Sequence, residues 1–461
     1  MAIAISQEAF DAMVRENMED LGMDPDEALA DAVEALTLQG ADISGIIKRV
    51  PGEAAAAEVS PVVRVLDELK ASPGARGGSG EDLGRLVSLL DELHGLCCSG
   101  VGSENAAIAV RNGGVETLVA LCASAQIEQE KLLASGLKAL SSMIRDIGST
   151  EKFRQSEGPK IVMDILKGGS ENSDLLDAGF SVVAAASAGN EVVKESFMDL
   201  KVDELILHLM RKKLKTNVQS LYEAVRVLLT PDDCRWWLLK YVYGYSRKFA
   251  EIGIAEVLIN ALRGQVPPSS LPSACAALKA IAVNDEICRS ISENGGIDVL
   301  LQCIDEAGEQ KNKVTAKSCC SLLSKLGASD ANKSVILQQG GFDKFLKLTS
   351  IFSEDASIIQ EAMSMVTVLT LRSPDNAARA MEVGYGTLAI QAMQRFPSSG
   401  QTQKQACLMI RNLVVRNPEN RTILLNNGVE KLIRKAKITH ASCKDAATAA
   451  LRDLGLDNYN A

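Results

Sequence analysis

The sequence predicts an all-α solenoid of about eight repeats, each made of three helices. A glycine-centred phrase recurs about every 44 residues, and a helix of small and aliphatic residues follows most copies about twenty residues later. Apolar residues make up 46% of the chain and aromatic residues only 4%, a mixture that suits helices packed closely on helices. Proline is sparse, at 12 of 461 residues, which leaves room for many helices.

The recurring phrase places a small or polar residue and Gly before an apolar run. It reads NGGVETLVAL at Gly114 and NGGIDVLLQCI at Gly296. Because Gly adopts a left-handed backbone without a steric penalty, we expect it to end a short first helix where a second helix leaves steeply. In one copy, DLKVDELILHL, Lys201 stands in place of Gly. The aligned glycines are Gly114, Gly158, Gly253, Gly296, Gly341, Gly384 and Gly428.

Two further phrases complete each repeat. Segments such as SACAALKAIAV, from Ser273, place small residues with Leu and Ile at helical spacing, which predicts a buried third helix. The triplets at 373–375 (Ser-Pro-Asp) and 417–419 (Asn-Pro-Glu) each offer an N-cap, a Pro at the first helical position and an acid in the first turn. They predict the start of a first helix, and Thr-Pro-Asp at 230–232 has the same form.

These phrases, in register over residues 83–456, resemble the armadillo repeat family. The resemblance implies a right-handed superhelical solenoid of about eight armadillo-type three-helix repeats, whose third helices line a concave groove that binds extended peptides. Two-helix HEAT repeats are the structural alternative. Residues 5–47, the segment KQACLMIRNLVVRNPENR and the closing AATAALRDLGL also resemble a narrower family within this group.

Helix signals and composition divide the chain into four parts. Ser6 and Asp24 each predict the N-cap of a helix, and these helices should end near Leu21 and Leu38. A linker rich in Pro and Gly follows, with a short helix expected near 62–71. The expected parts are an acidic helical segment at 1–50, the linker at 51–82, the repeat solenoid at 83–456 with an insertion at about 230–250, and a C-terminal tail at 457–461.

The net charge of −10 is unevenly distributed. Residues 1–40 hold ten acidic residues and one basic residue, a net −9, which leaves about −1 for the other 421 residues. A near-neutral body with two short basic runs, at 211–215 and 431–437, argues against specific nucleic-acid binding. The tethered acidic segment could instead compete for a basic groove in the same chain.

We expect no enzyme activity, no cofactor and no metal site. The linker glycines lack the GxxxxGK[ST] pattern, the H-x-x-C-C motif at 94–98 has no second ligand pair, and no nucleophile motif stands beside a histidine. The N-terminus lacks a signal-peptide pattern and no stretch of 18 uncharged apolar residues occurs, so we expect no membrane insertion. The eleven irregularly spaced cysteines favour reduced thiols and a cytoplasmic location, with the nucleus as an alternative. We expect a monomer.

Two regions are candidates for binding a partner protein. The insertion, DDCRWWLLKYVYGYSRKF at 232–249, holds six of the chain's 17 aromatic residues among basic ones. It is either an enlarged first helix packed on the solenoid or a partner-contact loop. Basic residues on or near third helices predict a groove for acidic or phosphorylated peptides. The candidate partner-binding residues are Arg226, Lys279, Lys325, Arg411, Asn412, Arg416, Arg235, Trp236, Trp237 and Tyr241.

These features predict a non-catalytic scaffold or adaptor that binds partner peptides along the groove. The alternative is a cargo carrier or chaperone-type transport factor related to nuclear-import receptors. In those relatives the groove carries Trp and Asn four residues apart, and the equivalent pairs here include Phe180/Ala184 and Leu408/Asn412. None holds Trp and only Asn412 matches, which argues against the alternative.

Overall fold

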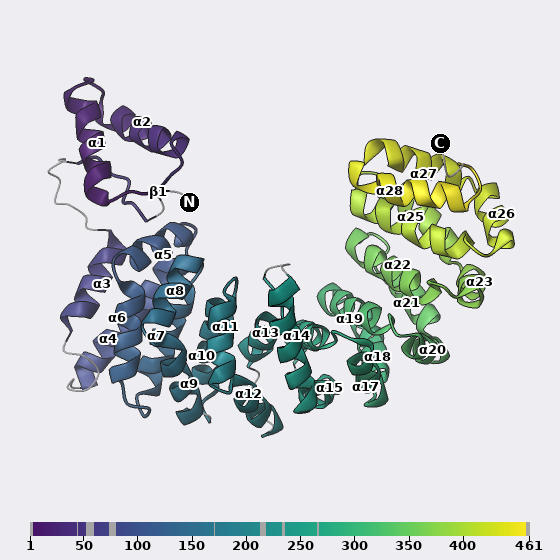
Figure 1. The fold of residues 1–461 in the computed structure, drawn as a ribbon, viewed down its shortest axis with the longest axis horizontal. Coiled ribbons are helices and arrows are strands. Elements are labelled where there is room, and N and C mark those ends of the chain that lie inside the picture. Colours follow the sequence, from purple (N-terminus) through teal and green to yellow (C-terminus); the bar gives the residue numbers. More distant parts are fainter. Residues whose placement is uncertain are drawn as a thin grey trace. The chain divides into compact units, whose positions relative to one another are not determined.

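The chain is helical along nearly all of its described length (Figure 1), which confirms the all-α solenoid. The computed structural model describes residues 3–43, 45–51, 60–72, 80–169, 171–212, 218–232, 236–264 and 267–457. The chain forms two compact units, the N-terminal unit (Met1–Val242) and the C-terminal unit (Tyr243–Ala461). The boundary falls within helix α14 (Trp236–Glu251).

The N-terminal unit begins with a small helical segment that has its own core. Helices α1 (Gln7–Glu19) and α2 (Pro25–Leu38) follow the predicted N-caps, because the Ser6 hydroxyl accepts from the Ala9 amide and the Asp24 carboxylate accepts from two amides of α2. Two-residue strands β1 (Ile3–Ala4) and β2 (Ala41–Asp42), which the sequence does not predict, pair in parallel. The buried residues of this core are Phe10, Val14, Ala28, Ala32, Leu36 and Ile46.

Three repeats follow two leading helices in the N-terminal unit. Each repeat has a first, a second and a third helix. The third helices pack in series, since α7 packs against α4, α10 against α7 and α13 against α10. The helices are α3 (Pro61–Ala71), which matches the short helix predicted in the linker, α4 (Gly80–Cys98), α5 (Gly102–Arg111), α6 (Gly114–Ser124), α7 (Glu130–Met143), α8 (Ile147–Gln155), α9 (Gly158–Gly168), α10 (Ser173–Ser187), α11 (Glu191–Asp199), α12 (Val202–Arg211) and α13 (Gln219–Leu228).

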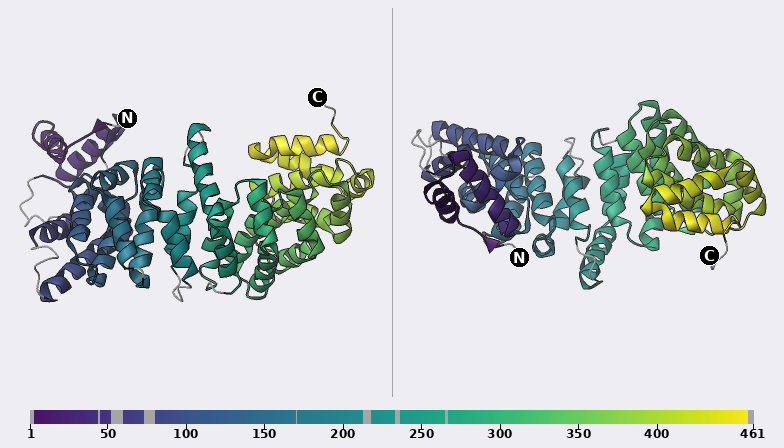
Figure 2. Two further views of the ribbon diagram at one scale, coloured as in Figure 1. Left: turned by 60° about the horizontal axis from the view of Figure 1, so that its bottom comes forward. Right: turned by 90° about the horizontal axis from the view of Figure 1, so that it is seen from above.

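The C-terminal unit continues the same pattern, and α14 serves as the first helix of its first repeat. Its third helices α16, α19, α22, α25 and α28 pack in series, and Figure 2 shows the stacking of helices within each unit from two other directions. The helices are α15 (Ile254–Leu262), α16 (Leu271–Ile281), α17 (Asp285–Glu293), α18 (Gly296–Glu309), α19 (Lys313–Leu326), α20 (Asp330–Gln338), α21 (Gly341–Ile351), α22 (Ala356–Thr370), α23 (Pro374–Val383), α24 (Tyr385–Arg395), α25 (Gly400–Val414), α26 (Pro418–Asn426), α27 (Val429–Thr439), the 3-10 turn η1 (Ala441–Cys443) and α28 (Lys444–Asp453).

One left-handed residue makes the turn between the first and second helices of every repeat. The predicted turns are present, but in four copies the aligned Gly is the residue after the left-handed one. Gly158 and Gly341 instead allow close approach, since a Cβ would lie 2.3 Å from the Phe153 ring and 2.6 Å from the Ile336 side chain. The left-handed residues are Gly113, Glu157, Lys201, Gly253, Gly295, Gly340, Gly384 and Gly428.

The predicted helix start at 230–232 is wrong, because Pro231 and Asp232 are not helical. The buried side chain of Lys194 explains the difference. Its ammonium contacts the carboxylate of Asp232, the carbonyl of Thr230 at 2.7 Å and the carboxylate of Glu191 at 3.1 Å. A buried charge needs such oxygen partners, and they hold this segment against α11. The other two starts are correct, with α23 at Pro374 and α26 at Pro418.

Asparagines in four of the first helices join these helices to the end of the third helix that precedes each of them. The amide of Asn332 donates to the carbonyls of Leu326 in α19, at 3.0 Å, and Cys288 in the previous repeat, at 2.9 Å. Asn420 donates in the same way to Leu413 in α25, at 2.8 Å. The last carbonyls of a helix lack partners within it, so these bonds satisfy them. Asn105 and Asn376 make the equivalent bonds to Leu96 and Leu369.

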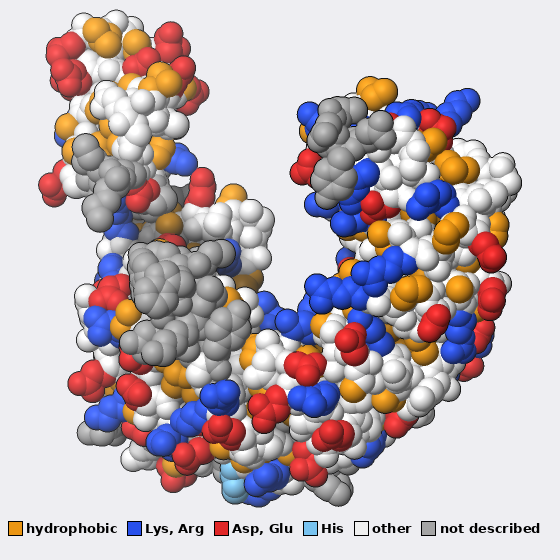
Figure 3. Space-filling model, turned by 45° about the vertical axis from the view of Figure 1, so that its right-hand side comes forward, with side chains coloured by type: hydrophobic (Ala, Val, Ile, Leu, Met, Phe, Trp, Pro, Cys, Tyr) orange, Lys and Arg blue, Asp and Glu red, His pale blue; other side chains and the backbone are white. Residues whose placement is uncertain are grey.

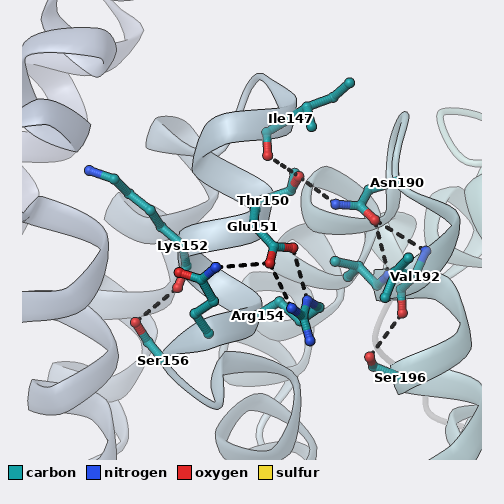
Figure 4. Close-up of polar contacts among 11 residues, drawn as sticks. Ile147, Thr150, Glu151, Lys152, Arg154, Ser156, Asn190, Val192 and Ser196 are labelled. Atoms are coloured by element: carbon teal, nitrogen blue, oxygen red, sulfur yellow. Dashed lines mark hydrogen bonds and ion pairs between the residues drawn. The ribbon is translucent and has the colours of Figure 1, made fainter.

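A related contact links the first helices of two successive repeats in the N-terminal unit (Figure 4). The Asn190 amide nitrogen donates to the Thr150 hydroxyl at 2.8 Å, while its oxygen caps α11 by accepting from the Val192 amide at 3.1 Å. One side chain therefore caps the start of one helix and anchors it to another. Beside it, Glu151 accepts from Arg154, which lowers the pKa of Glu151 to about 2.

Replacing Lys201 with Gly should stabilise the N-terminal unit. Lys201 holds a φ of 66°, which costs an L-residue with a side chain about 1 kcal/mol relative to Gly. Thermal denaturation followed by circular dichroism should show a higher Tm for Lys201→Gly. Lys201→Ala keeps the strained conformation and loses only the exposed contact with Glu204, so it is the matched control and should show no gain. Equal Tm values for the two variants would contradict this explanation.

Replacing Asn420 with Ala should destabilise the C-terminal unit by about 1–3 kcal/mol, because a buried carbonyl loses its donor. Urea denaturation measures this loss. Asn427→Ala is the control, since Asn427 is exposed and donates only to Ile423 of its own helix. The interpretation fails if both variants unfold at the same urea concentration.

Candidate functional site

Four of the five third helices of the C-terminal unit, α16, α19, α22 and α25, present a continuous surface. We call it the third-helix face and define it as their exposed and half-buried residues. The positions equivalent to the ladder of nuclear-import receptors lie on this surface and are all exposed or half-buried. They are Ala276, Ala280, Ser321, Lys325, Ser364, Val368, Leu408 and Asn412.

The same register does not hold on α10 in the N-terminal unit. Phe180, expected on the groove side of α10, is fully buried, and Ala184 is 8% exposed. Ser181 and Ala185, one residue later, are the half-buried pair. The aromatic ring is buried in the core, so the surface of α10 is displaced by one residue from the expected register.

Polar bonds between neighbouring helices fix several side chains of the third-helix face. The ammonium of Lys279 on α16 donates to the Ser321 hydroxyl on α19 at 2.6 Å. The Asn412 amide on α25 donates to the Thr367 carbonyl on α22 at 2.8 Å. Gln405 donates to the hydroxyl of Thr367 at 3.0 Å. These bonds hold the surface in a defined arrangement before any partner arrives.

The third-helix face is basic, whereas its counterpart in the N-terminal unit is not. Helices α16, α19, α22 and α25 carry six basic residues and one acidic residue, Glu361. Helices α7, α10 and α13 carry three basic and four acidic residues. Lys and Arg side chains gather on one side of the C-terminal unit in Figure 3. The basic residues of the face are Lys279, Lys313, Lys317, Lys325, Lys404 and Arg411.

The structure places half of the candidate partner-binding residues on or beside this face. Lys279 and Lys325 are exposed, Arg411 and Asn412 are half-buried, and Arg416 is exposed just after α25. Lys317 and Lys404 are exposed there too, although neither was a candidate. Their position on the polar side of a third helix is the sequence signal that could have identified them.

The other candidates do not join this surface. Arg226 lies on α13 in the N-terminal unit and forms a two-pronged ion pair with Glu223 of the same helix, and this hydrogen bonding raises the pKa of Arg226. Arg235 lies outside the described residues. Trp236, Trp237 and Tyr241 belong to α14, but their side chains lie outside the described part of the structure.

The aromatic insertion lengthens a first helix. Helix α14 has 16 residues, whereas α17 and α20 have nine each. At its C-terminal end Phe249 is fully buried and Tyr245 is half-buried. The described part of the insertion therefore fits an enlarged first helix packed on the solenoid, while its first aromatic side chains stay untested as partner contacts.

The acidic N-terminal segment contacts the first repeat in this structure. The Arg111 guanidinium on α5 donates to the Ile5 carbonyl at 2.7 Å, and Lys48 lies 3.1 Å from the carboxylate of Glu104. Both contacts lie within the N-terminal unit. Competition of this segment for a basic groove stays a prediction.

Cysteine and histidine residues form no recognised metal-binding cluster among the described residues. In the H-x-x-C-C motif, Cys97 is buried and Cys98 is exposed, as expected for adjacent residues on a helix. No single described helix is long and apolar enough to cross a bilayer, and only α5 and α6 together, bent by 74°, meet that length and composition.

Two family profiles match the chain. ARMC6 matches residues 64–458, and the Armadillo repeat-containing protein 6 N-terminal domain matches residues 2–63. These matches confirm the narrower resemblance given for residues 5–47 and for the C-terminal segments, which is to armadillo repeat-containing protein 6.

Three relatives and two solved structures illustrate the similarity. Armadillo repeat-containing protein 6 is 27% identical in Homo sapiens and 28% in Pongo abelii, each covering 81% of this chain and 75% of the relative. The Drosophila melanogaster homolog is 26% identical, over 83% of this chain and 81% of the relative. An engineered protein has a TM-score of 0.46 at 18% identity, over 56% of this chain and 96% of that one. A designed armadillo repeat protein in complex with a (KR)4 peptide has a TM-score of 0.44 at 17% identity, over 53% and 97%.

Replacing Arg411 with Glu should lower the stability of the C-terminal unit. The Arg411 guanidinium on α25 lies 3.0 Å from Asp453 on α28, whose side chain is only 10% exposed. A carboxylate at 411 would face that acid and cost about 1–2 kcal/mol. Thermal denaturation should show a lower Tm for Arg411→Glu and an unchanged Tm for Lys325→Glu, an equal charge reversal at an exposed site. Equal losses would show that net charge, and not this ion pair, is responsible.

Proposed function

The chain belongs to the armadillo repeat-containing protein 6 family, and we propose that it is a non-catalytic scaffold that binds acidic or phosphorylated segments of partner proteins along the third-helix face. The observation that carries this proposal is the charge of that face, six basic residues against one acidic residue. The basic run at 431–437 lies on α27, a second helix outside this face, and the chain as a whole carries a net charge of −10.

The chemistry of the exposed side chains supports an anionic partner. Lys317, Lys325 and Lys404 are exposed, so their ammonium groups are available to carboxylate or phosphate oxygens. Successive third helices present them at repeated positions, which suits a partner that is extended and carries several negative groups. Attraction across such a face is screened by salt, so binding should weaken as ionic strength rises.

The rigidity of the face also supports a binding role. The bonds Lys279–Ser321 and Asn412–Thr367 cross from one third helix to the next. A surface that is already ordered loses less conformational entropy when it binds a flexible peptide. The partner, which must become ordered, then bears most of that cost.

The alternative, a cargo carrier related to nuclear-import receptors, would require recognition of basic segments. The basic third-helix face opposes such recognition electrostatically. Asn412, the single ladder residue that matches, uses its amide within the solenoid by donating to Thr367. We therefore favour the scaffold that binds acidic segments.

Peptide binding tests both functions directly. Fluorescence anisotropy should show that fluorescein-labelled octaglutamate and a phosphoserine-containing acidic octapeptide bind the full chain at low salt, whereas labelled octalysine does not. Reversing two charges on α19, in Lys317→Glu/Lys325→Glu, should weaken acidic-peptide binding by about tenfold or more, because two attractive contacts become repulsive.

The control for that variant is Lys431→Glu/Lys435→Glu, an identical charge change at exposed positions on the second helix α27. It should leave acidic-peptide binding close to that of the unmodified chain. Equal losses of acidic-peptide affinity in the two variants would show that net charge, and not the third-helix face, is responsible. Preferential binding of octalysine would overturn the proposal in favour of the cargo carrier.

A further inference from the structure

Two buried thiols meet at the junction of the last two repeats of the C-terminal unit. The sulfur of Cys407 on α25 lies 3.8 Å from the sulfur of Cys443 in η1, and both residues are fully buried. A disulfide would need the sulfurs to approach by about 2 Å. Such an approach is within reach of side-chain rotation with a small shift of a three-residue 3-10 turn.

The surroundings of Cys443 favour its thiolate. It occupies the N-cap position of α28, where the helix dipole and the free amides stabilise negative charge. Its hydrogen bond with Cys407 lowers the pKa of Cys443, and the Lys404 ammonium adds to this lowering against the opposing effect of burial. The same hydrogen bond, together with burial, raises the pKa of Cys407. The N-cap position of Cys443 therefore favours it over Cys407 as the thiol that reacts first.

We propose that Cys407 and Cys443 form a peroxide-sensitive dithiol site, in which Cys443 is oxidised first and Cys407 then closes a disulfide. The Cys443 thiolate attacks one oxygen of hydrogen peroxide, the O–O bond breaks, and hydroxide leaves as the sulfur becomes a sulfenic acid. The Cys407 sulfur attacks the Cys443 sulfur, the S–O bond breaks, and the departing hydroxide takes the Cys407 proton to form water. In total, two thiols and one peroxide yield one disulfide and two waters.

Access to the buried sulfur requires only a local opening. The residues on either side of Cys443 are exposed, so the buried thiol lies close to the surface; they are Ala441, Ser442, Lys444 and Asp445. Opening a single 3-10 turn would expose it, and such short elements open at much lower free energy than the core of a repeat.

A second thiol pair in the same unit provides an internal comparison. The sulfurs of Cys275 on α16 and Cys319 on α19 also lie 3.8 Å apart. Both residues sit within long helices beside other buried residues, and hydrogen bonding to Cys275 raises the pKa of Cys319. Equal sulfur separation with a protonated and inaccessible thiol should therefore give slower oxidation.

Mass spectrometry of the full chain tests the site. The reduced protein is treated with hydrogen peroxide, free thiols are blocked with iodoacetamide at intervals, and the digest is searched for linked peptides. The Cys407–Cys443 link should appear roughly tenfold faster than a Cys275–Cys319 link, because reactivity follows thiolate character and access. Exposed Cys98 reports that peroxide has reacted. The site is refuted if Cys98 is oxidised while no Cys407–Cys443 link forms, or if the Cys275–Cys319 link forms first.

Two variants separate the two steps. In Cys407→Ser, Cys443 should stop at the sulfenic acid and be trapped by dimedone, whereas in Cys443→Ser, Cys407 should gain no dimedone adduct. The reverse pattern would overturn the assignment of roles. Hydrogen exchange of the unmodified chain gives a readout that needs no variant, since the oxidised form should exchange more slowly than the reduced form in η1 and α28. An unchanged exchange rate in a fully linked sample would refute the proposed closure of this junction.

Discussion

Every repeat depends on one backbone constraint, a residue with positive φ between its first and second helices. Six of these residues are glycines, which adopt that conformation freely, and two are Glu157 and Lys201, which adopt it under strain. The turn lets the second helix leave at a steep angle while the first helix stays in contact with its neighbours. Because the second helix then leads into the third, this turn also decides which side of each third helix is exposed.

The stacked third helices convert that local constraint into a surface. Their small residues permit close packing, and asparagines such as Asn332 and Asn420 bind the carbonyls at their ends. Lys279 and Asn412 add bonds across the exposed side. Some polar residues of this surface therefore stabilise the solenoid as well as being available to a partner. Because Arg411 forms an ion pair with Asp453, a substitution of Arg411 affects both stability and binding. Lys317 and Lys325 report on binding more cleanly because they are exposed.

The repeat length and the helix order could be predicted from the sequence because Gly spacing and apolar periodicity are local signals. The predicted position of the left-handed residue is wrong by one residue in four copies. Paired glycines such as Gly340 and Gly341 look alike in sequence and differ only in what surrounds them. Phe180 was placed on the wrong side of α10 because a one-residue shift follows from packing between helices. The start predicted at 230–232 failed because Lys194, 36 residues before Thr230, holds that segment.

Parts of the candidate site lay beyond sequence reasoning for the same reason. The basic character of the third-helix face could be foreseen from Lys279, Lys325 and Arg411. The pairing of Cys407 with Cys443 could not, because residues 36 apart meet only through the fold. The bond between Asn412 and Thr367 could not be foreseen either. Through this bond, the one residue that matches the ladder uses its amide for a contact within the protein.

The polar bonds between repeats have a further consequence for how the chain acquires its structure. Those from Asn332 to Cys288, Lys333 to Leu371 and Asn412 to Thr367 join residues 44, 38 and 45 apart, so each spans about one repeat. When contacts join only residues about one repeat apart, a repeat can form before any distant segment of the chain is in place. Folding can then begin at any well-formed pair of repeats and spread to its neighbours, and a weakened repeat would stall that spread locally without abolishing structure on either side.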